Sequence, residues 1–185
     1  MPVNSEGFTL PEMLIALLLS GLLLGGAMRV LPALQAGVMR ASAELTAWRE
    51  LERLAATLGK TLQRSGYCAG HCQGKGLVIE PGVNCISAAW DENHNGRWEP
   101  EEHTALRLRA GSIEIHRGTS GCNGAGWERI SAPESLRLTG WQVEVQLRPG
   151  WPPRVVQRLS AQPVSAGRSS TRTLALIHNV TGFNL

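Results

Sequence analysis

The start of the sequence contains very little charge. No Lys or Arg precedes Arg29, and no charged residue lies between Glu12 and Arg29. A secretory signal peptide carries a basic segment ahead of a shorter apolar core. The pattern therefore argues against a signal peptide, although Gly25-Gly26-Ala27 resembles a small-residue cleavage site.

Motifs of common enzyme classes are also absent from the sequence. There is no Gly-x-Ser-x-Gly segment, no Walker loop and no dinucleotide-binding fingerprint, and the five histidines lack metal-pair spacing. His103, next to two glutamates, has the character of a solvated loop residue. We therefore expect that the protein is not an enzyme.

A long apolar run follows the sparsely charged start. From Phe8 to Met28 the chain has 21 residues, and Glu12 is the only charged one. A helix rises about 1.5 Å per residue, so this segment can cross a hydrocarbon layer of about 30 Å. A charge inside a membrane costs on the order of 3 kcal/mol. Glu12 is thus a functional candidate that needs a partner.

The segment Gly7-Phe8-Thr9-Leu10-Pro11-Glu12 resembles the class III signal of type IV pilins and type II secretion pseudopilins. The resemblance implies that residues 1–7 are a leader, which prepilin peptidase removes after Gly7. It further implies N-methylation of Phe8 as the new N-terminus. Phe8 and Glu12 would serve assembly, because the Glu12 carboxylate would pair with the Phe8 amine of a neighbouring subunit and offset the desolvation of both charges.

Two positions depart from the usual signal. Pro11 occupies a place where the family has an aliphatic residue, but it falls in the first helical turn, where a missing N–H costs little. The leader carries Glu6 and no basic residue, so the positive-inside rule does not orient the segment. The resemblance implies a cytoplasmic N-terminus and a periplasmic globular domain.

The helical pattern continues beyond the apolar run. We expect a transmembrane or filament-core helix over 8–28 and its amphipathic continuation over 29–66, with a kink or locally melted turn near Pro32 and Gly37. The helix should end at Arg64-Ser65-Gly66. The apolar stripe of the continuation consists of Leu45, Trp48, Leu51, Ala55, Leu58 and Leu62.

Short strands are expected from residue 67 onward, in a globular domain over 67–185. Alternating or apolar segments bounded by Gly and Pro predict them, and Ala110-Gly111 predicts a two-residue hairpin turn. The expected strands are 77–80, 85–90, 105–109, 112–116, 141–147, 154–159 and 173–177, with Pro149, Pro152, Pro153 and Pro163 dividing the later ones. This order predicts an α+β fold in which a long N-terminal helix packs on an antiparallel sheet, as in pilins.

All four cysteines follow the apolar run. An even number beyond a membrane span fits disulfides in an oxidising periplasm, and three pairings of Cys68, Cys72, Cys85 and Cys122 are open. A zinc site that combines His71 with three of these cysteines is a less favoured alternative. The residues after Met28 carry a net charge of +5. Because this charge is spread along the chain, it predicts a solvated surface and makes a nucleic-acid partner unlikely.

One loop has the pattern of a calcium site. The twelve residues from Asp91 to Glu102 fit D-x-[DN]-x-[DN]-G-x5-E in full. Possible ligands are Asp91, Asn93, Asn95, the Arg97 carbonyl, Glu99 and Glu102. The alternative is an Asx-rich turn without an ion, because Asp and Asn also stabilise tight turns.

Later segments resemble those of minor pilins of enterobacterial-type type IV pilus systems. These segments are 67–72, 76–77, Cys85, 90–93, 121–127 and 180–185. The resemblance implies a minor pilin that primes or joins pilus assembly, with prepilin peptidase, other minor and major pilins and the inner membrane as partners. The alternatives are a J-like pseudopilin of a type II secretion system and a membrane-tethered module that binds DNA or calcium. Of the six tryptophans, Trp151 is the one expected to lie exposed at a partner surface.

Overall fold

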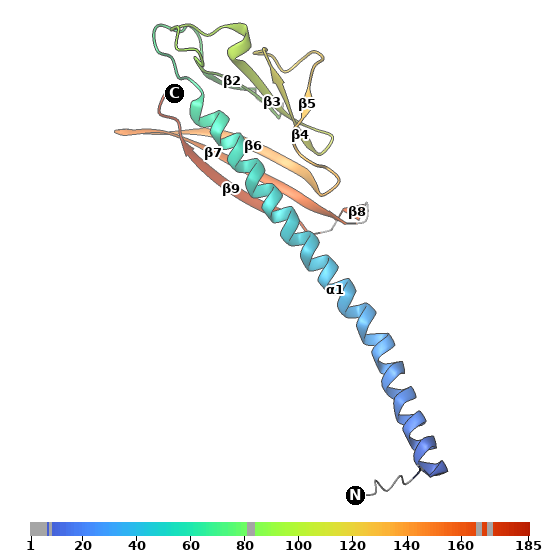
Figure 1. Ribbon diagram of the computed structural model, residues 1–185. Helices are drawn as coiled ribbons and strands as arrows, with labels where there is room; N and C mark the ends of the chain where they lie inside the picture. Colours follow the sequence, from blue (N-terminus) through green and yellow to red (C-terminus); the bar gives the residue numbers. More distant parts are fainter. Residues whose placement is uncertain (1–6, 8, 81–83, 166–167, 170–171) are drawn as a thin grey trace, which may run out of the picture. The chain divides into compact units, whose positions relative to one another are not determined.

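The computed structural model describes residue 7 and the segments 9–80, 84–165, 168–169 and 172–185. The chain divides into two compact units, Met1–Ser42 and Ala43–Leu185. One helix, α1 (Leu10–Arg64), contributes its first part to the first unit and its last part to the second. Figure 1 shows the elements of both units.

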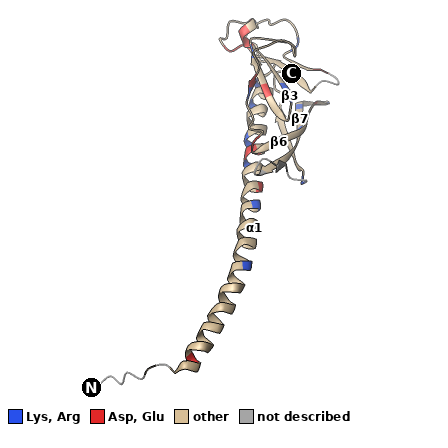
Figure 2. Ribbon diagram, turned by 90° about the vertical axis from the view of Figure 1, so that its right-hand side faces the viewer, with Lys and Arg blue, Asp and Glu red and all other residues tan. Residues whose placement is uncertain are grey.

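In the first unit the described structure is helical from Leu10 onward. The helix runs without interruption through Pro32 and Gly37. The expected locally melted turn is therefore absent from this structure of a single chain. A proline removes one N–H from the helix interior, but the flanking turns keep their hydrogen bonds. Figure 2 shows the uncharged stretch of the helix between Glu12 and Arg29.

A five-stranded antiparallel sheet forms the first layer of the second unit. Its strands follow the chain in the order β1-β2-β3-β4-β5. They are β1 (Leu77–Glu80), β2 (Cys85–Ala89), β3 (His103–Arg109), β4 (Ser112–Arg117) and β5 (Glu128–Arg129), with the short 3-10 helix η1 (Pro100–Glu102) before β3. Ala110 and Gly111 join β3 to β4 with φ values of 51° and 80°. Positive φ at both central residues is the signature of the type I′ turn, so the expected two-residue hairpin is confirmed.

A second antiparallel sheet contains the longest strands. It consists of β6 (Leu136–Arg148), β7 (Trp151–Ser165), β8 (Arg168–Ser169) and β9 (Leu174–Thr181), and β7 pairs with each of the other three. The expectation that Pro152, Pro153 and Pro163 divide strands is wrong, because all three lie inside β7. Proline is tolerated where a strand needs no ladder N–H. The Pro153 carbonyl still accepts a hydrogen bond from the Gly182 N–H at 2.8 Å.

The hydrophobic core lies between the last turns of α1 and the two sheets. The buried helix residues are Ala47, Leu51, Leu54, Ala55, Leu58, Gly59 and Leu62. They pack with strand residues such as Leu106, Ile113, Leu136 and Leu159. Leu45 is 58% exposed, so its assignment to the stripe is wrong. The core begins at Ala47, and Leu54, which lies one turn before Leu58, belongs to the same face.

Polar contacts anchor this helix segment to the second sheet. The buried Gln157 of β7 donates from Nε2 to the Ala55 carbonyl at 2.7 Å and lies 3.0 Å from Nδ1 of His178. A Cβ at Gly59 would lie 2.6 Å from Cε1 of His178. The helix therefore approaches β9 so closely that a side chain at this position would force His178 to shift.

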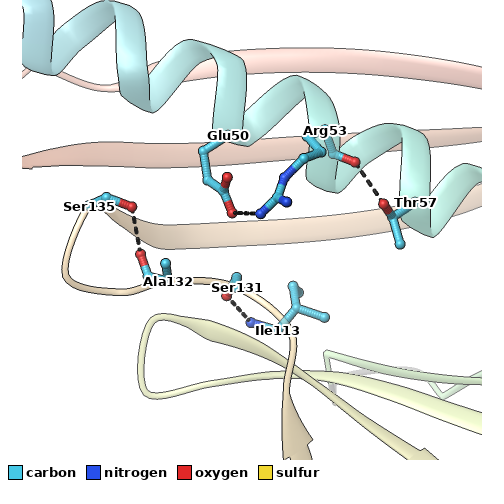
Figure 3. A network of polar contacts seen from close by, with 7 residues as sticks. All are labelled: Glu50, Arg53, Thr57, Ile113, Ser131, Ala132 and Ser135. Carbon is cyan, nitrogen blue, oxygen red and sulfur yellow. Dashed lines mark hydrogen bonds and ion pairs between the residues drawn. The ribbon is translucent and has the colours of Figure 1, made fainter.

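The connection between the two sheets is held by hydroxyl groups. The buried Ser131 accepts the Ile113 N–H at 2.9 Å, and the Ser135 hydroxyl donates to the Ala132 carbonyl at 3.1 Å (Figure 3). The same view shows the Glu50–Arg53 ion pair on α1. The serines of this connection thus satisfy one backbone N–H of β4 and one carbonyl of the connection itself.

Two disulfides complete the second unit. Cys68 bonds to Cys72, and Cys85 bonds to Cys122. The zinc alternative is wrong, because the sulfur atoms of these four cysteines are bonded in pairs. α1 ends at Arg64, as expected, and Gly66 follows with φ 85°. The fold is α+β and pilin-like, with a long N-terminal helix packed on antiparallel sheets.

Candidate functional site

The beginning of α1 is stabilised by its own side chains. The Glu12 carboxylate accepts the backbone N–H of Thr9 at 2.9 Å and the Thr9 hydroxyl at 2.8 Å. This contact is one half of a capping box, in which the side chain of the third helical residue accepts a hydrogen bond from the backbone N–H of the residue before the helix. Pro11 lies in the first turn, where its missing N–H has no intrahelical partner to lose. The helix tolerates Pro11 as expected.

The role of Thr9 as the cap of the helix was not among the sequence predictions. The pattern Ser/Thr-x-x-Glu at Thr9-Leu10-Pro11-Glu12 is a sequence-level sign of a helix start. Gly7 is exposed, with no atom within 4 Å of the position of a Cβ. Phe8 lies outside the described residues, so its assigned cleavage, methylation and assembly roles stay predictions.

The helix in the first unit presents its apolar side chains outward. Every residue from Leu10 to Ser42 is exposed, including Leu18 at 65% and Leu23 at 76%. Its most apolar window has a mean hydropathy of 2.1, and by length and composition the helix can cross a membrane. Burying apolar surface gains about 25 cal/mol per Å². The exposed helix therefore needs lipid or other protein around it.

The Asp91–Glu102 loop folds around two buried carboxylates. Asp91 is 1% exposed and Glu102 is 5% exposed. Asp91 accepts the N–H groups of Ala69 and Gly96 at 2.9 Å and that of Asn95 at 3.0 Å. Glu102 accepts the N–H groups of residues 92, 93 and 99 at 2.8 to 3.2 Å. The carboxylates thus hold the loop closed through its backbone.

These hydrogen bonds set the pKa values of both carboxyls. Burial by itself raises the pKa of Asp91, but the N–H groups of Ala69 and of residues 94–96 outweigh it and leave the pKa below its usual range. The pKa of Glu102 is also below its usual range. Burial and the nearby Asp91 charge raise this pKa, but hydrogen bonds from three backbone N–H groups lower it by more. Both groups are therefore ionised at neutral pH.

Most of the predicted calcium ligands come together in the loop. Asn93 and Asn95 both donate from Nδ2 to Glu99, at 3.0 and 3.1 Å. Gly96, the sixth residue, has φ 79° and allows the sharp turn. The Arg97 N–H bonds to the Asn95 side-chain oxygen at 3.0 Å. The loop offers the oxygen ligands that calcium prefers, and calcium binding itself stays a prediction.

A bound ion would have to displace existing contacts. A carboxylate has about four acceptor sites, and the three N–H groups on Glu102 use most of them. Glu99 likewise would have to exchange amide donors for the ion. Cys68 and Cys72 lie near Asp91, but their sulfur atoms are bonded to each other, so this group offers no thiolate ligand.

An aromatic cavity next to the loop was not expected from the sequence. It has a volume of about 480 Å³ and lies among the end of α1, the loop and the last residues of the chain. Tyr67 and His94 contact edge to face, with ring centres 5.6 Å apart. Trp98 donates from Nε1 to the Tyr67 carbonyl at 2.9 Å. No local sequence signal predicts this cavity, because its lining comes from three distant segments.

Comparisons with known proteins agree with the signal and the fold. The family model described as prepilin peptidase-dependent protein B matches residues 40–180, and the prokaryotic N-terminal methylation motif matches residues 3–28. The chain is 37% identical over 191 aligned positions to prepilin peptidase-dependent protein B of Escherichia coli (strain K12), and the alignment covers all of both chains. No solved structure matches. The later sequence motifs, from 67–72 to 180–185, single out this same pilin-like group.

Proposed function

Because the chain belongs to the prepilin peptidase-dependent protein B family, we propose that it is a minor type IV pilin. The family is structural and pilin-like, and is not known as an enzyme family. One observation carries the proposal: α1 begins at a prepilin-type signal and then exposes apolar side chains on all sides. Such a surface suits a helix that moves from a lipid bilayer into a filament core.

Processing is the first step of the proposed function. Prepilin peptidase would cut after Gly7, and Phe8 would become the methylated N-terminus. Gly7 is exposed and precedes the helix, which suits a cleavage position. The N-terminal helix fits an inner-membrane anchor, and the two disulfides support a periplasmic location for the second unit.

Assembly is the second step. The Glu12 carboxylate now accepts two hydrogen bonds from Thr9, and in a filament it would pair with the Phe8 amine of a neighbouring subunit. In a low-dielectric surrounding, removing one partner of such a pair leaves an uncompensated charge. The helix would then set the position of the globular domain among other minor and major pilins.

Mass spectrometry of the N-terminus tests the processing step. The protein isolated from membranes should begin with N-methylated Phe8, and in a strain without prepilin peptidase it should begin at Met1. A cut after Ala27, or an intact Met1 when the peptidase is present, would contradict the proposal.

A Glu12→Gln variant tests the assembly step. It keeps the hydrogen-bond acceptor for Thr9 but not the charge, so it should be processed and yet fail to enter pili. Glu52→Gln, an exposed position on the same helix, is the matched control. Deleting the gene separates a pilus subunit, whose loss removes surface pili, from a J-like pseudopilin, whose loss stops protein secretion.

We infer calcium binding by the Asp91–Glu102 loop as a second candidate function. The favouring observation is charge: within the described part of the chain, Asp91, Glu99 and Glu102 form no ion pair with Lys, Arg or His. Calcium at millimolar concentration should raise the melting temperature of the full chain in detergent, and Glu102→Gln should abolish the rise. An unchanged melting temperature would contradict calcium binding.

A further inference from the structure

The β6–β7 hairpin projects from the end of the second sheet (Figure 1). Residues of this hairpin and of the chain end line a groove with a volume of about 440 Å³. The hairpin lines it on one side, and the last residues of the chain line it on the other. The lining includes Gln146, Arg148, Trp151, Arg154 and Phe183. The proposed assembly steps above use the N-terminal helix and leave this groove unassigned.

The groove exposes large apolar side chains. Trp151 is 75% exposed and Phe183 is 69% exposed, so both rings face solvent over most of their surface. By contrast, Trp141, which lies further from the hairpin end of β6, is 3% exposed and belongs to the core. Nothing in the packing of the second unit requires Trp151 to be apolar. Exposed aromatic rings gathered in one place mark interaction surfaces.

Two arginines in the groove have no carboxylate partner. Arg148 and Arg154 are exposed and take part in none of the ion pairs found among the described residues. Arg158, which lies four residues after Arg154 in β7, is by comparison paired with Glu144 at 3.1 Å. Trp151 lines the same groove as these two unpaired arginines. This combination matches the composition of protein interface centres, which are rich in Trp and Arg.

Phe183 lines both the arginine groove and the 480 Å³ cavity. The Lys, Arg, Asp and Glu residues that line the cavity are Arg64, Asp91 and Glu92, whereas those that line the groove are Arg148 and Arg154. Glu92 is exposed and forms no ion pair among the described residues. Both of the Arg residues that line the groove, Arg148 and Arg154, are cationic and no described Asp or Glu lines it, so the groove favours an anionic partner segment. Two cations neutralise about two phosphates, which contributes little of the affinity that nucleic-acid binding requires.

We propose that this groove docks an acidic segment of a different protein. The partner's carboxylates pair with Arg148 and Arg154, and an apolar side chain next to them rests on Trp151 and Phe183. Charge complementarity gives the contact its orientation and rate of formation, and burial of the aromatic rings supplies the affinity.

Photo-crosslinking of the full chain in its own host tests the proposal. p-Benzoylphenylalanine replaces Gln146, which lines the groove, and in a control chain it replaces the exposed Arg129 of β5. The adduct at position 146 should be a protein whose crosslinked peptide, identified by mass spectrometry, contains Asp or Glu next to an apolar residue. The control position should not give this adduct.

Charge reversal then tests the role of the arginines. Arg148→Glu combined with Arg154→Glu should reduce the adduct at least about tenfold, because like charges would face each other. Trp151→Ala should reduce it by a similar factor. Arg117→Glu, at an exposed arginine of the other sheet, should leave it unchanged. Correct disulfides on a non-reducing gel and unchanged protease resistance show that each variant is folded.

Several results would overturn the proposal. These are the absence of an adduct at position 146, an adduct with nucleic acid or with a second copy of this chain, and an adduct that persists at full yield in the double arginine variant. The test does not depend on pilus formation. A chain that fails to enter pili but keeps the arginine-dependent adduct would contradict the proposed function and leave the docking site standing.

Discussion

The side chains of helix α1 have opposite surroundings in the two compact units. In the first unit every described helical residue is exposed, whereas in the second the helix buries seven residues against two sheets. The second unit also satisfies its buried carboxylates and closes two disulfides internally. One part of the helix thus obtains its stability from the protein itself, and the other must obtain its surroundings from lipid or neighbouring subunits. Substitutions should separate these two situations.

The largest expected effect concerns the disulfides of the second unit. Replacing Cys85 and Cys122 by Ala should lower the free energy of unfolding by about 4 kcal/mol, because their separation of 37 residues closes a long loop. Replacing Cys68 and Cys72, four residues apart, should cost about 2 kcal/mol. Denaturant unfolding of the full chain in detergent measures both. Equal costs would contradict the loop-length argument.

A matched pair of leucines tests the helix directly. Leu58 is 1% exposed and Leu18 is 65% exposed. Leu58→Ala should lower the free energy of unfolding by about 3 kcal/mol, since it leaves a cavity in the core. Leu18→Ala should leave unfolding of the second unit unchanged. The comparison fails if both variants, measured by denaturant unfolding of the full chain, lose the same stability.

A matched pair of glycines gives a smaller effect of the same kind. Gly59→Ala should destabilise by about 1 kcal/mol, because its Cβ would lie 2.6 Å from His178, even though Ala is the better helix former. Gly37 has no atom within 4 Å of its Cβ position, so Gly37→Ala should not lower the melting temperature of the chain. A Gly59→Ala variant with raised melting temperature would show that the helix and β9 can separate without cost.

The smallest effect is a dependence on pH that only the second unit should show. The pKa values of Asp91 and Glu102 are lower in the folded protein than in the unfolded chain. Their stabilising contribution is therefore complete above the unfolded values of about 4 and is lost as the pH falls through the folded values. Unfolding measured between about pH 6 and pH 3 should show this loss, and Glu102→Gln should make the dependence shallower. Equal slopes in the two proteins would argue against a role for Glu102.

Local patterns predicted much of the fold. The end of the helix at Arg64 and the Ala110-Gly111 hairpin depend on nearby residues, and the structure confirms them. The apolar stripe was also correct except at Leu45. The prolines of β7 were misjudged because a proline breaks a strand only where its N–H is needed. That need depends on which strand lies alongside.

The candidate sites also differ in whether their residues are contiguous in the sequence. The prepilin-type signal and the Asp91–Glu102 loop are contiguous, so their residue types and spacing are visible in the sequence. The arginine groove joins the β6–β7 hairpin to Phe183, which lies about thirty residues further along the chain. Only the exposure of Trp151 could be anticipated. Its neighbours in the groove depend on how the fold places the hairpin next to the chain end.

The sequence by itself determined the apolar helix, its cap and the order of one helix followed by strands, because each depends on contacts within a few residues. The tertiary structure decided which cysteines pair. Cys85 lies opposite Arg107 across β2 and β3, and the Arg107 side chain donates to the Cys122 carbonyl at 3.4 Å. The tertiary structure also decided that Gly59 of α1 lies against the His178 side chain of β9. Strand register and helix placement bring distant residues together, and no periodicity along the chain encodes those distances.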